Sequence, residues 1–101
     1  MTPQMPRMEA RTPAKAAIRV SLLDRPESSE TLAIEDVSRH GARAFAAVPW
    51  RQGDRVLVQA LKSTFRAHGR IVYCKPIEGE GARGRFVVGL EFFSPTGKWE
   101  D

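Results

Sequence analysis

The sequence predicts an all-β domain in which six antiparallel strands form a barrel. Short segments with alternating apolar and polar residues recur along the chain, and Gly, Pro or polar clusters separate them. No segment has the apolar spacing of a long amphipathic helix. An open sheet of this size would leave two exposed edges, so closure into a barrel is favoured.

The predicted strands are short and are joined by turns. They cover residues 16–22, 31–37, 43–48, 55–61, 64–74 and 85–93. Residues 24–30 are polar and contain Pro26, which predicts a loop between the first two strands. After the last strand, Ser94 and Pro95 could begin a helical turn, and Gly97 followed by the end of the sequence limits it to one short turn.

The alternation also predicts which side chains face the core. In the fifth strand the apolar face holds Phe65, Ala67, Ile71 and Tyr73, and the other face holds Arg66, His68 and Arg70. The last strand places Phe86, Val88, Leu90 and Phe92 on its core face. Gly69 falls on the apolar face of the fifth strand, where it predicts a bend or bulge. We expect Trp50, in the turn after the third strand, to cap one end of the barrel rather than to stack on a ligand.

The composition fits one folded domain. The chain has 101 residues, of which 42% are apolar and 28% are charged. Cys74 is the single cysteine, and with two histidines it makes a structural metal site improbable, so we expect no metal and no cofactor. No apolar run has the length of a membrane span and residues 1–17 lack the apolar core of a signal peptide, so a cytoplasmic location is expected.

Two short groups of polar residues stand out against this background. Arg7 and Arg11 lie in a proline-containing segment of little apolar content, residues 1–14, which is predicted to be a flexible arm. The barrel is expected to follow at residues 15–93 and a short tail at residues 94–101. Guanidinium groups supply the forked donors that phosphate or a guanine edge requires. The formal charge of +4 also favours an anionic partner.

The second group follows the second predicted strand. Asp36 offers a carboxylate, Ser38 a hydroxyl, and Gly41 a backbone that can adopt positive φ and let a ligand lie close. The alternation with Leu32 and Ile34 predicts that Asp36 shares their face at the rim of the barrel. The residues alone leave an alternative, in which Asp36 is a turn former that bonds local backbone amides.

These two groups resemble the two-part signature of the PilZ domain family, whose members bind the bacterial second messenger cyclic di-GMP. The signature residues are Arg7-x-x-x-Arg11 and Asp36-x-Ser38-x-x-Gly41. The segment 11–20 resembles the family's arm and first strand, and Val88-Gly-Leu-Glu-Phe92 resembles its last barrel strand. The resemblance covers about nine tenths of the chain and implies a split-barrel fold.

The resemblance also implies a function and a binding site. We expect a single-domain cyclic di-GMP receptor whose arm becomes ordered over the nucleotide and which signals through a downstream protein. Arg7 and Arg11 would grip guanine edges and phosphates, and the Asp36, Ser38 and Gly41 group would hold the other side. Further ligand contacts could come from Arg39, His40 and Gly89. Pro6 stands where members that bind two stacked ligands often have another arginine, which favours a single ligand.

The sequence is also compatible with other classes of function. The first alternative is a PilZ-like scaffold that binds a protein and not the nucleotide. A barrel that binds single-stranded nucleic acid is less favoured, because the alternation assigns most aromatic rings to the core. An enzyme is least favoured, because Glu35 and Asp36 point to opposite faces of one strand and no catalytic residues are evident. Ser38 and His40 are close in sequence, but no third group is in view to orient the imidazole.

Overall fold

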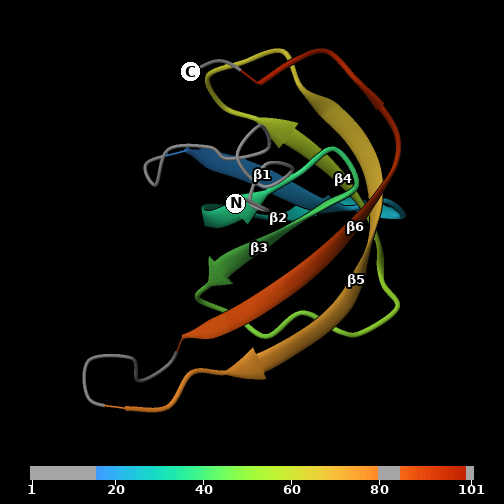
Figure 1. Cartoon of the computed structure of the whole chain (residues 1–101). Coiled ribbons are helices and arrows are strands. Elements are labelled where there is room, and N and C mark those ends of the chain that lie inside the picture. Colours follow the sequence, from blue (N-terminus) through green and yellow to red (C-terminus); the bar gives the residue numbers. More distant parts are fainter. Residues whose placement is uncertain (1–15, 80–84, 100–101) are drawn as a thin grey trace, which may run out of the picture.

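The fold is a closed antiparallel barrel. A computed structural model of the protein describes residues 16–79 and 85–99. Its strands are β1 (Ala17–Leu22), β2 (Arg25–Val37), β3 (Gly41–Ala46), β4 (Arg55–Ala60), β5 (Arg66–Pro76) and β6 (Phe86–Thr96). They close in the order β1-β2-β3-β6-β5-β4, with every neighbouring pair antiparallel (Figure 1). The predicted all-β barrel of six strands is therefore confirmed.

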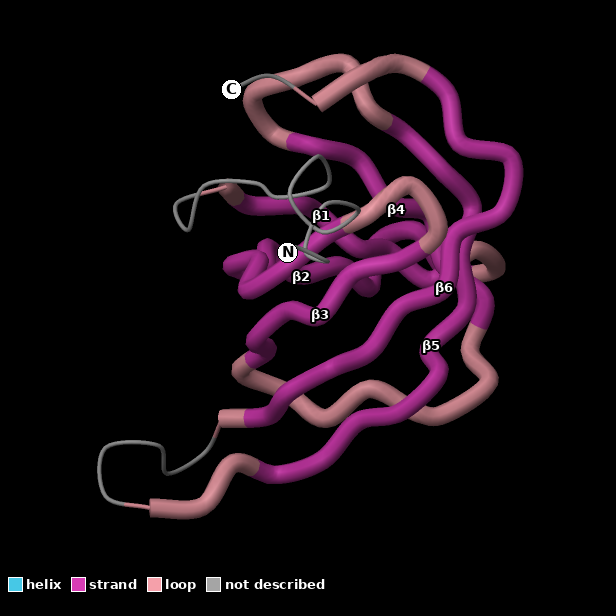
Figure 2. The backbone as a smooth tube through the Cα atoms, in the orientation of Figure 1, coloured by secondary structure: helices cyan, strands magenta, loops and turns pink. Residues whose placement is uncertain are grey.

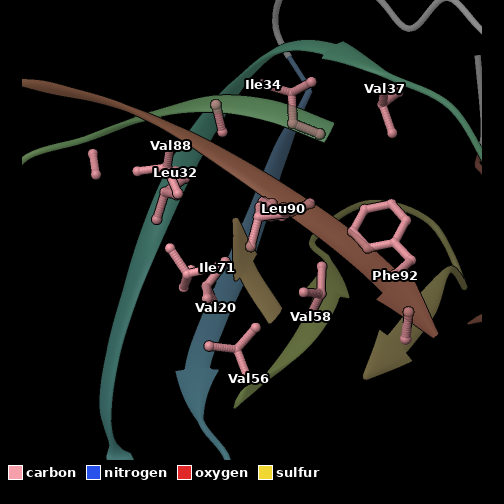
Figure 3. Packing of buried hydrophobic residues seen from close by; sticks show 14 of the residues in the cluster. Val20, Leu32, Ile34, Val37, Val56, Val58, Ile71, Val88, Leu90 and Phe92 are labelled. Carbon is pink, nitrogen blue, oxygen red and sulfur yellow. The ribbon is translucent and has the colours of Figure 1, made fainter. Parts of the chain in front are cut away.

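The core is a single cluster inside the barrel, and all six strands contribute to it (Figure 3). Its largest fully buried side chains are Ile18, Leu32, Ile71, Val20, Val56, Val58 and Val88. Most of these residues are β-branched, and such side chains pack well on a pleated sheet. Along β4 the fully buried Val56 and Val58 alternate with less buried residues, as the sequence predicted, whereas in β1 Ser21 is buried as well as Val20.

The second strand is longer than predicted. β2 begins at Arg25, directly after a tight turn at Leu23 and Asp24, so most of the expected loop at residues 24–30 is strand. The register with β1 jumps from Ser29 to Arg25, which leaves residues 26–28 without partners on that strand. Pro26 lies in this unpaired stretch, so its missing amide hydrogen removes no hydrogen bond from the ladder.

Two bulges shift which side chains face the core. In β2 the register shifts between Ile34 and Asp36, and Val37 takes the buried position while Asp36 is exposed. The prediction that Asp36 continues the inward face of β2 is therefore wrong. In β5 a bulge between Ile71 and Tyr73 leaves Tyr73 only half-buried, so its predicted place in the core is wrong too. An extra residue in one strand reverses the alternation beyond it.

The two ends of the barrel are covered by tryptophans. Trp50 packs against the core at one end, as expected, and its Nε1 donates a hydrogen bond of 2.9 Å to Glu30 Oε1. Trp99 covers the other end, where its ring stacks on Phe65 with 4.4 Å between centroids. Lys98 N donates to Thr64 Oγ1 at 3.0 Å, which fixes the chain beside this end.

The last strand runs further than predicted. β6 continues through Ser94 and Pro95 to Thr96, where the sequence suggested the start of a helical turn. Figure 2 shows strands, loops and turns throughout the described residues and no helix. Those ranges accordingly contain no helix that could cross a membrane.

β5 also runs further than the strand beside it. β4 pairs with β5 only as far as Arg70, and the backbone of Ile71 bonds instead to Gly53 and Asp54 in the preceding loop. From Val72 to Pro76 the strand is paired with β6 on one side only, within the described residues.

Candidate functional site

The connection between β2 and β3 carries the polar motif and is fixed by its own hydrogen bonds. Ser38 N donates to Gly41 O at 2.8 Å, and His40 N donates to Ser38 Oγ at 3.2 Å. The carbonyl of His40 in turn accepts a bond of 2.8 Å from Phe92 N on β6. These bonds hold the connection against the barrel wall. The Ser38 oxygen therefore has a structural role besides any contact with a ligand.

Asp36 is exposed on the outer surface beside this connection. It pairs with Arg43 across the β2–β3 ladder, so both side chains leave the same face of the sheet. Among the hydrogen bonds of the described residues, none ends on the Asp36 carboxylate. The alternative reading as a turn former that bonds local amides finds no support in this geometry. The carboxylate is left available to accept hydrogen bonds from outside the barrel.

Gly41 is required for a reason that differs from the one expected. Its φ is not among the positive values, which within the described residues occur at Ser94 and at Gly53, Gly79 and Gly97. A Cβ at position 41 would instead overlap the carbonyl oxygen of Leu90 on β6. The glycine thus allows two backbones to approach closely. The positive φ that its backbone could adopt is not used here.

Strand pairing places Asp36 in a row of four outward positions, one on each of four strands. Asp36 on β2 is opposite Arg43 on β3, Arg43 is opposite Gly89 on β6, and Gly89 is opposite Tyr73 on β5. Gly89 lies between the core residues Val88 and Leu90, so its α-carbon hydrogens face outward. We call Asp36, Arg43, Gly89 and Tyr73 the outer row.

The outer row is held together by the arginine and the tyrosine. Arg43 Nε donates to the Tyr73 hydroxyl at 3.2 Å, and its guanidinium lies 3.8 Å from Glu35 Oε1. The hydrogen bond with Tyr73 raises the pKa of Arg43, and the charges of Tyr73, Glu35 and Asp36 act in the same direction. Arg43 is therefore a fixed cation next to the Asp36 carboxylate.

Gly89 is covered by an aromatic ring. A Cβ at this position would overlap the ring of Tyr73, so only glycine lets the ring lie flat on β6. Lys75 Nζ lies 5.4 Å from the centroid of the same ring. A ligand that reached this point would meet the tyrosine ring and not the glycine backbone. Direct contact with Gly89, as the resemblance implied, would require that Tyr73 move.

Arg43, Tyr73 and Lys75 were not predicted from the sequence. The alternation placed Tyr73 inside, and the bulge that turns it outward has no local sequence signal. Of the other expected contacts, Arg39 and His40 are both exposed in the β2–β3 connection. Their side chains have no hydrogen bond to another described residue.

Arg7 and Arg11 lie outside the described residues, but the point from which their segment continues is known. Ala16 O accepts a bond of 3.0 Å from Ile34 N, so the chain before β1 leaves the barrel beside the end of β2. Arg11 is five positions before Ala16 in the sequence, and five extended steps of the chain span at most about 17 Å. Asp36 is two residues from Ile34, so the described chain begins near the Asp36 end of the outer row.

One hollow of the described surface lies at the opposite end of the barrel. It is an open groove of about 490 Å³ beside Trp50, lined also by Leu22, Asp24 and Val48. Glu30 lies in it, but its two carboxylate oxygens already accept bonds from Trp50 Nε1 and from Ala47 N. This carboxylate serves the packing of the barrel end, so the groove is not part of the candidate site.

The comparison with known protein families gives one match. Residues 6–98 match the PilZ domain, which is nearly the whole chain of 101 residues. The chain belongs to the PilZ domain family, a family of cyclic di-GMP receptor domains that bind a ligand. Searches of curated proteins and of solved structures returned no match.

Proposed function

We propose that this protein is a cyclic di-GMP receptor that binds the nucleotide on the outer row beside the β2–β3 connection. The observation that carries the proposal is the Asp36 carboxylate, which is exposed, is not used by local backbone amides, and lies at the barrel end from which the arginine segment continues. A carboxylate there can accept hydrogen bonds from the edge of a guanine base. Membership of the PilZ family supports the choice of ligand.

Each part of the ligand would then meet a suitable group. Arg7 and Arg11 would bind guanine edges and phosphates from the solvent side, as forked donors. Asp36 and Ser38 would bind from the barrel side. The ring of Tyr73 offers an apolar surface on the far side of two intervening strands, β3 and β6, and Arg43 on β3 adds a positive charge between them. Pro6, in place of a further arginine, favours one ligand per chain.

Signalling would follow from the ordering of the arm. Residues 1–14 would be ordered only when the arginines engage the ligand, and this would change the surface that the protein presents to a partner. Charge-assisted hydrogen bonds contribute about 1.5–3 kcal/mol each, and several are needed to offset the entropy lost by such a segment.

A titration of the full chain with cyclic di-GMP by calorimetry tests the proposal, with GTP and cyclic GMP as controls. We expect selective binding with a Kd of micromolar or below and one ligand per chain. Arg7→Ala, Arg11→Ala and Asp36→Ala should each weaken binding at least about tenfold, because each removes a charge-assisted bond. The melting temperature should change little, since Asp36 is exposed and the arm is expected to lie outside the core.

Arg51→Ala is a matched control, because Arg51 is an exposed arginine in the loop at the opposite end of the barrel. Its binding should equal that of the unaltered protein. An equal loss in Arg51→Ala and Arg11→Ala would mean that only general charge attraction is being measured. That result would refute the specific roles of the arm arginines.

The second candidate is a protein-binding scaffold that does not bind the nucleotide. It is favoured by the glycines, because Gly41 and Gly89 both have a packing reason that would hold without any ligand. Absence of heat and an unchanged melting temperature at millimolar cyclic di-GMP would establish this candidate over the first.

A further inference from the structure

The barrel has a basic outer surface centred on β4 and β5. In the closed order of strands, β4 lies across the barrel from β3, and β5 lies across from β2. We define the β4–β5 face by the outward residues of β1, β4, the first half of β5 and the adjoining part of β6. These residues are Arg19, Arg55, Leu57, Gln59, Arg66, His68, Arg70, Glu91 and Phe93.

The strand register arranges this face in three rows. Arg19, Gln59 and Arg66 pair across β1, β4 and β5 in the first row. In the middle row, Leu57 is opposite His68, which is opposite Phe93. In the third row, Arg55 is opposite Arg70, which is opposite Glu91. Apolar and aromatic groups therefore occupy the centre, and arginines lie on both sides of them.

The charge of the face is strongly one-sided. Arg70 is bound to Glu91 through bonds of 2.7 Å and 3.3 Å to one carboxylate oxygen. Within the described residues no other ion pair involves the face, so Arg19, Arg55 and Arg66 have no ion-pair partner there. All three side chains are exposed. Together with Arg70 they give the face four arginines against one carboxylate, Glu91.

The centre of the face combines ordered apolar and cationic side chains. The Arg55 guanidinium lies 5.6 Å from the centroid of the Phe93 ring, a position that holds its planar group over the ring. Phe93 and Leu57 are both half-buried, so each is packed against the barrel and still exposes apolar surface. An apolar centre with arginine and aromatic residues, surrounded by polar groups, is the composition of protein interfaces.

We propose that the β4–β5 face is the docking surface for an acidic protein segment, one that presents Asp or Glu side chains around a central apolar residue. Arginines bind carboxylates through paired hydrogen bonds, and Leu57 with Phe93 would take up the apolar residue. A single nucleic-acid strand fits less well, because stacking needs exposed rings and Phe93 is half-buried beneath Arg55. This surface adjoins the outer row on β5 and β6 but shares no residue with it, so the proposal does not depend on nucleotide binding.

The test uses the isotope-labelled full chain and a synthetic peptide of twelve residues with one leucine flanked by four glutamates. We expect amide chemical-shift changes at Leu57, Arg66, His68 and Phe93, and none at Asp36 or Arg43. A peptide with alanine in place of the leucine should bind several-fold more weakly. A fifteen-nucleotide oligothymidine is the third probe.

Paired variants show whether position matters as well as charge. The double variant Arg19→Glu with Arg66→Glu should weaken peptide binding at least tenfold. The double variant Arg25→Glu with Arg51→Glu makes the same change of net charge at exposed positions outside the face, and it should bind nearly as well as the unaltered chain. Both variants must retain the melting temperature of the parent.

Three results would overturn the proposal. Equal losses in the two double variants would show that binding follows total charge and not this face. Tighter binding of oligothymidine than of the peptide, with shifts on the same residues, would make the face a nucleic-acid site. No shift changes at millimolar peptide would mean that the face has no affinity for acidic segments.

Discussion

Gly41→Ala tests whether this glycine is required by packing of the barrel wall. Its Cβ would overlap the backbone oxygen of Leu90, which cannot move without displacing β6 from β3. Overpacking of this kind costs about 1–3 kcal/mol. Since the φ of Gly41 is not positive, alanine also restricts the unfolded chain, which returns about 0.4–1 kcal/mol. We therefore expect a net loss of about 1–2 kcal/mol and a melting temperature roughly 5–15 °C lower.

Two other glycines provide graded comparisons. A Cβ at Gly69 would lie 2.8 Å from the backbone oxygen of Glu91, which is less close, so Gly69→Ala should cost less than Gly41→Ala. At Gly89 the obstacle is the ring of Tyr73, the end of a side chain that can turn away. Gly89→Ala should therefore cost least of the three.

Urea denaturation followed by tryptophan fluorescence measures these differences directly. The order of stability loss is the critical result. If Gly89→Ala destabilises the protein as much as Gly41→Ala, the contact with the Leu90 carbonyl is not what requires glycine at position 41. The reasoning from backbone approach would then be refuted.

Two further predictions concern the core and the barrel end. Phe92→Ala should lower the free energy of unfolding by about 3–5 kcal/mol, because Phe92 is 5% exposed, and Phe86→Ala should cost clearly less, because Phe86 is only half-buried at the start of β6. Equal losses in denaturation experiments would contradict the burial of β6. Glu30→Ala should cost about 1–3 kcal/mol, since it leaves the Trp50 indole N–H and the Ala47 amide without their acceptor. The tryptophan emission spectrum of the Glu30→Ala variant should shift as the environment of Trp50 changes. An unaltered spectrum with unaltered stability would show that these two hydrogen bonds contribute nothing.

Much of the barrel could be predicted because alternation is a local property. Val56 and Val58 alternate with less buried neighbours, and every residue needed to recognise β4 is within that segment. The errors occur where pairing between strands decides the outcome. Pro26 is a breaker in most contexts, and it is tolerated in β2 because the register leaves it unpaired. The inward place of Val37 likewise depends on a bulge that only the partner strand reveals.

The candidate site was likewise predictable only where its residues are close in sequence. Asp36, Ser38 and Gly41 are close in sequence, and their spacing made them recognisable. The outer row depends on strands that are far apart in the chain, since Arg43, Tyr73 and Gly89 become neighbours only through the order β3-β6-β5. The covering of the second barrel end by Trp99 was also not predicted, because a single tryptophan after the last strand has no pattern around it.

The one-sided pairing of β5 has a consequence for self-association. Between Val72 and Pro76 the described structure has an open strand edge, and an open edge is a template to which another chain can add a strand. Pro76 has no amide hydrogen to offer an incoming strand, Lys75 adds a charge that discourages stacking, and Trp50 N donates to Cys74 Sγ at 3.3 Å from the adjacent loop. These three features hinder strand addition at the open edge of β5. They therefore favour a chain that does not aggregate at high concentration.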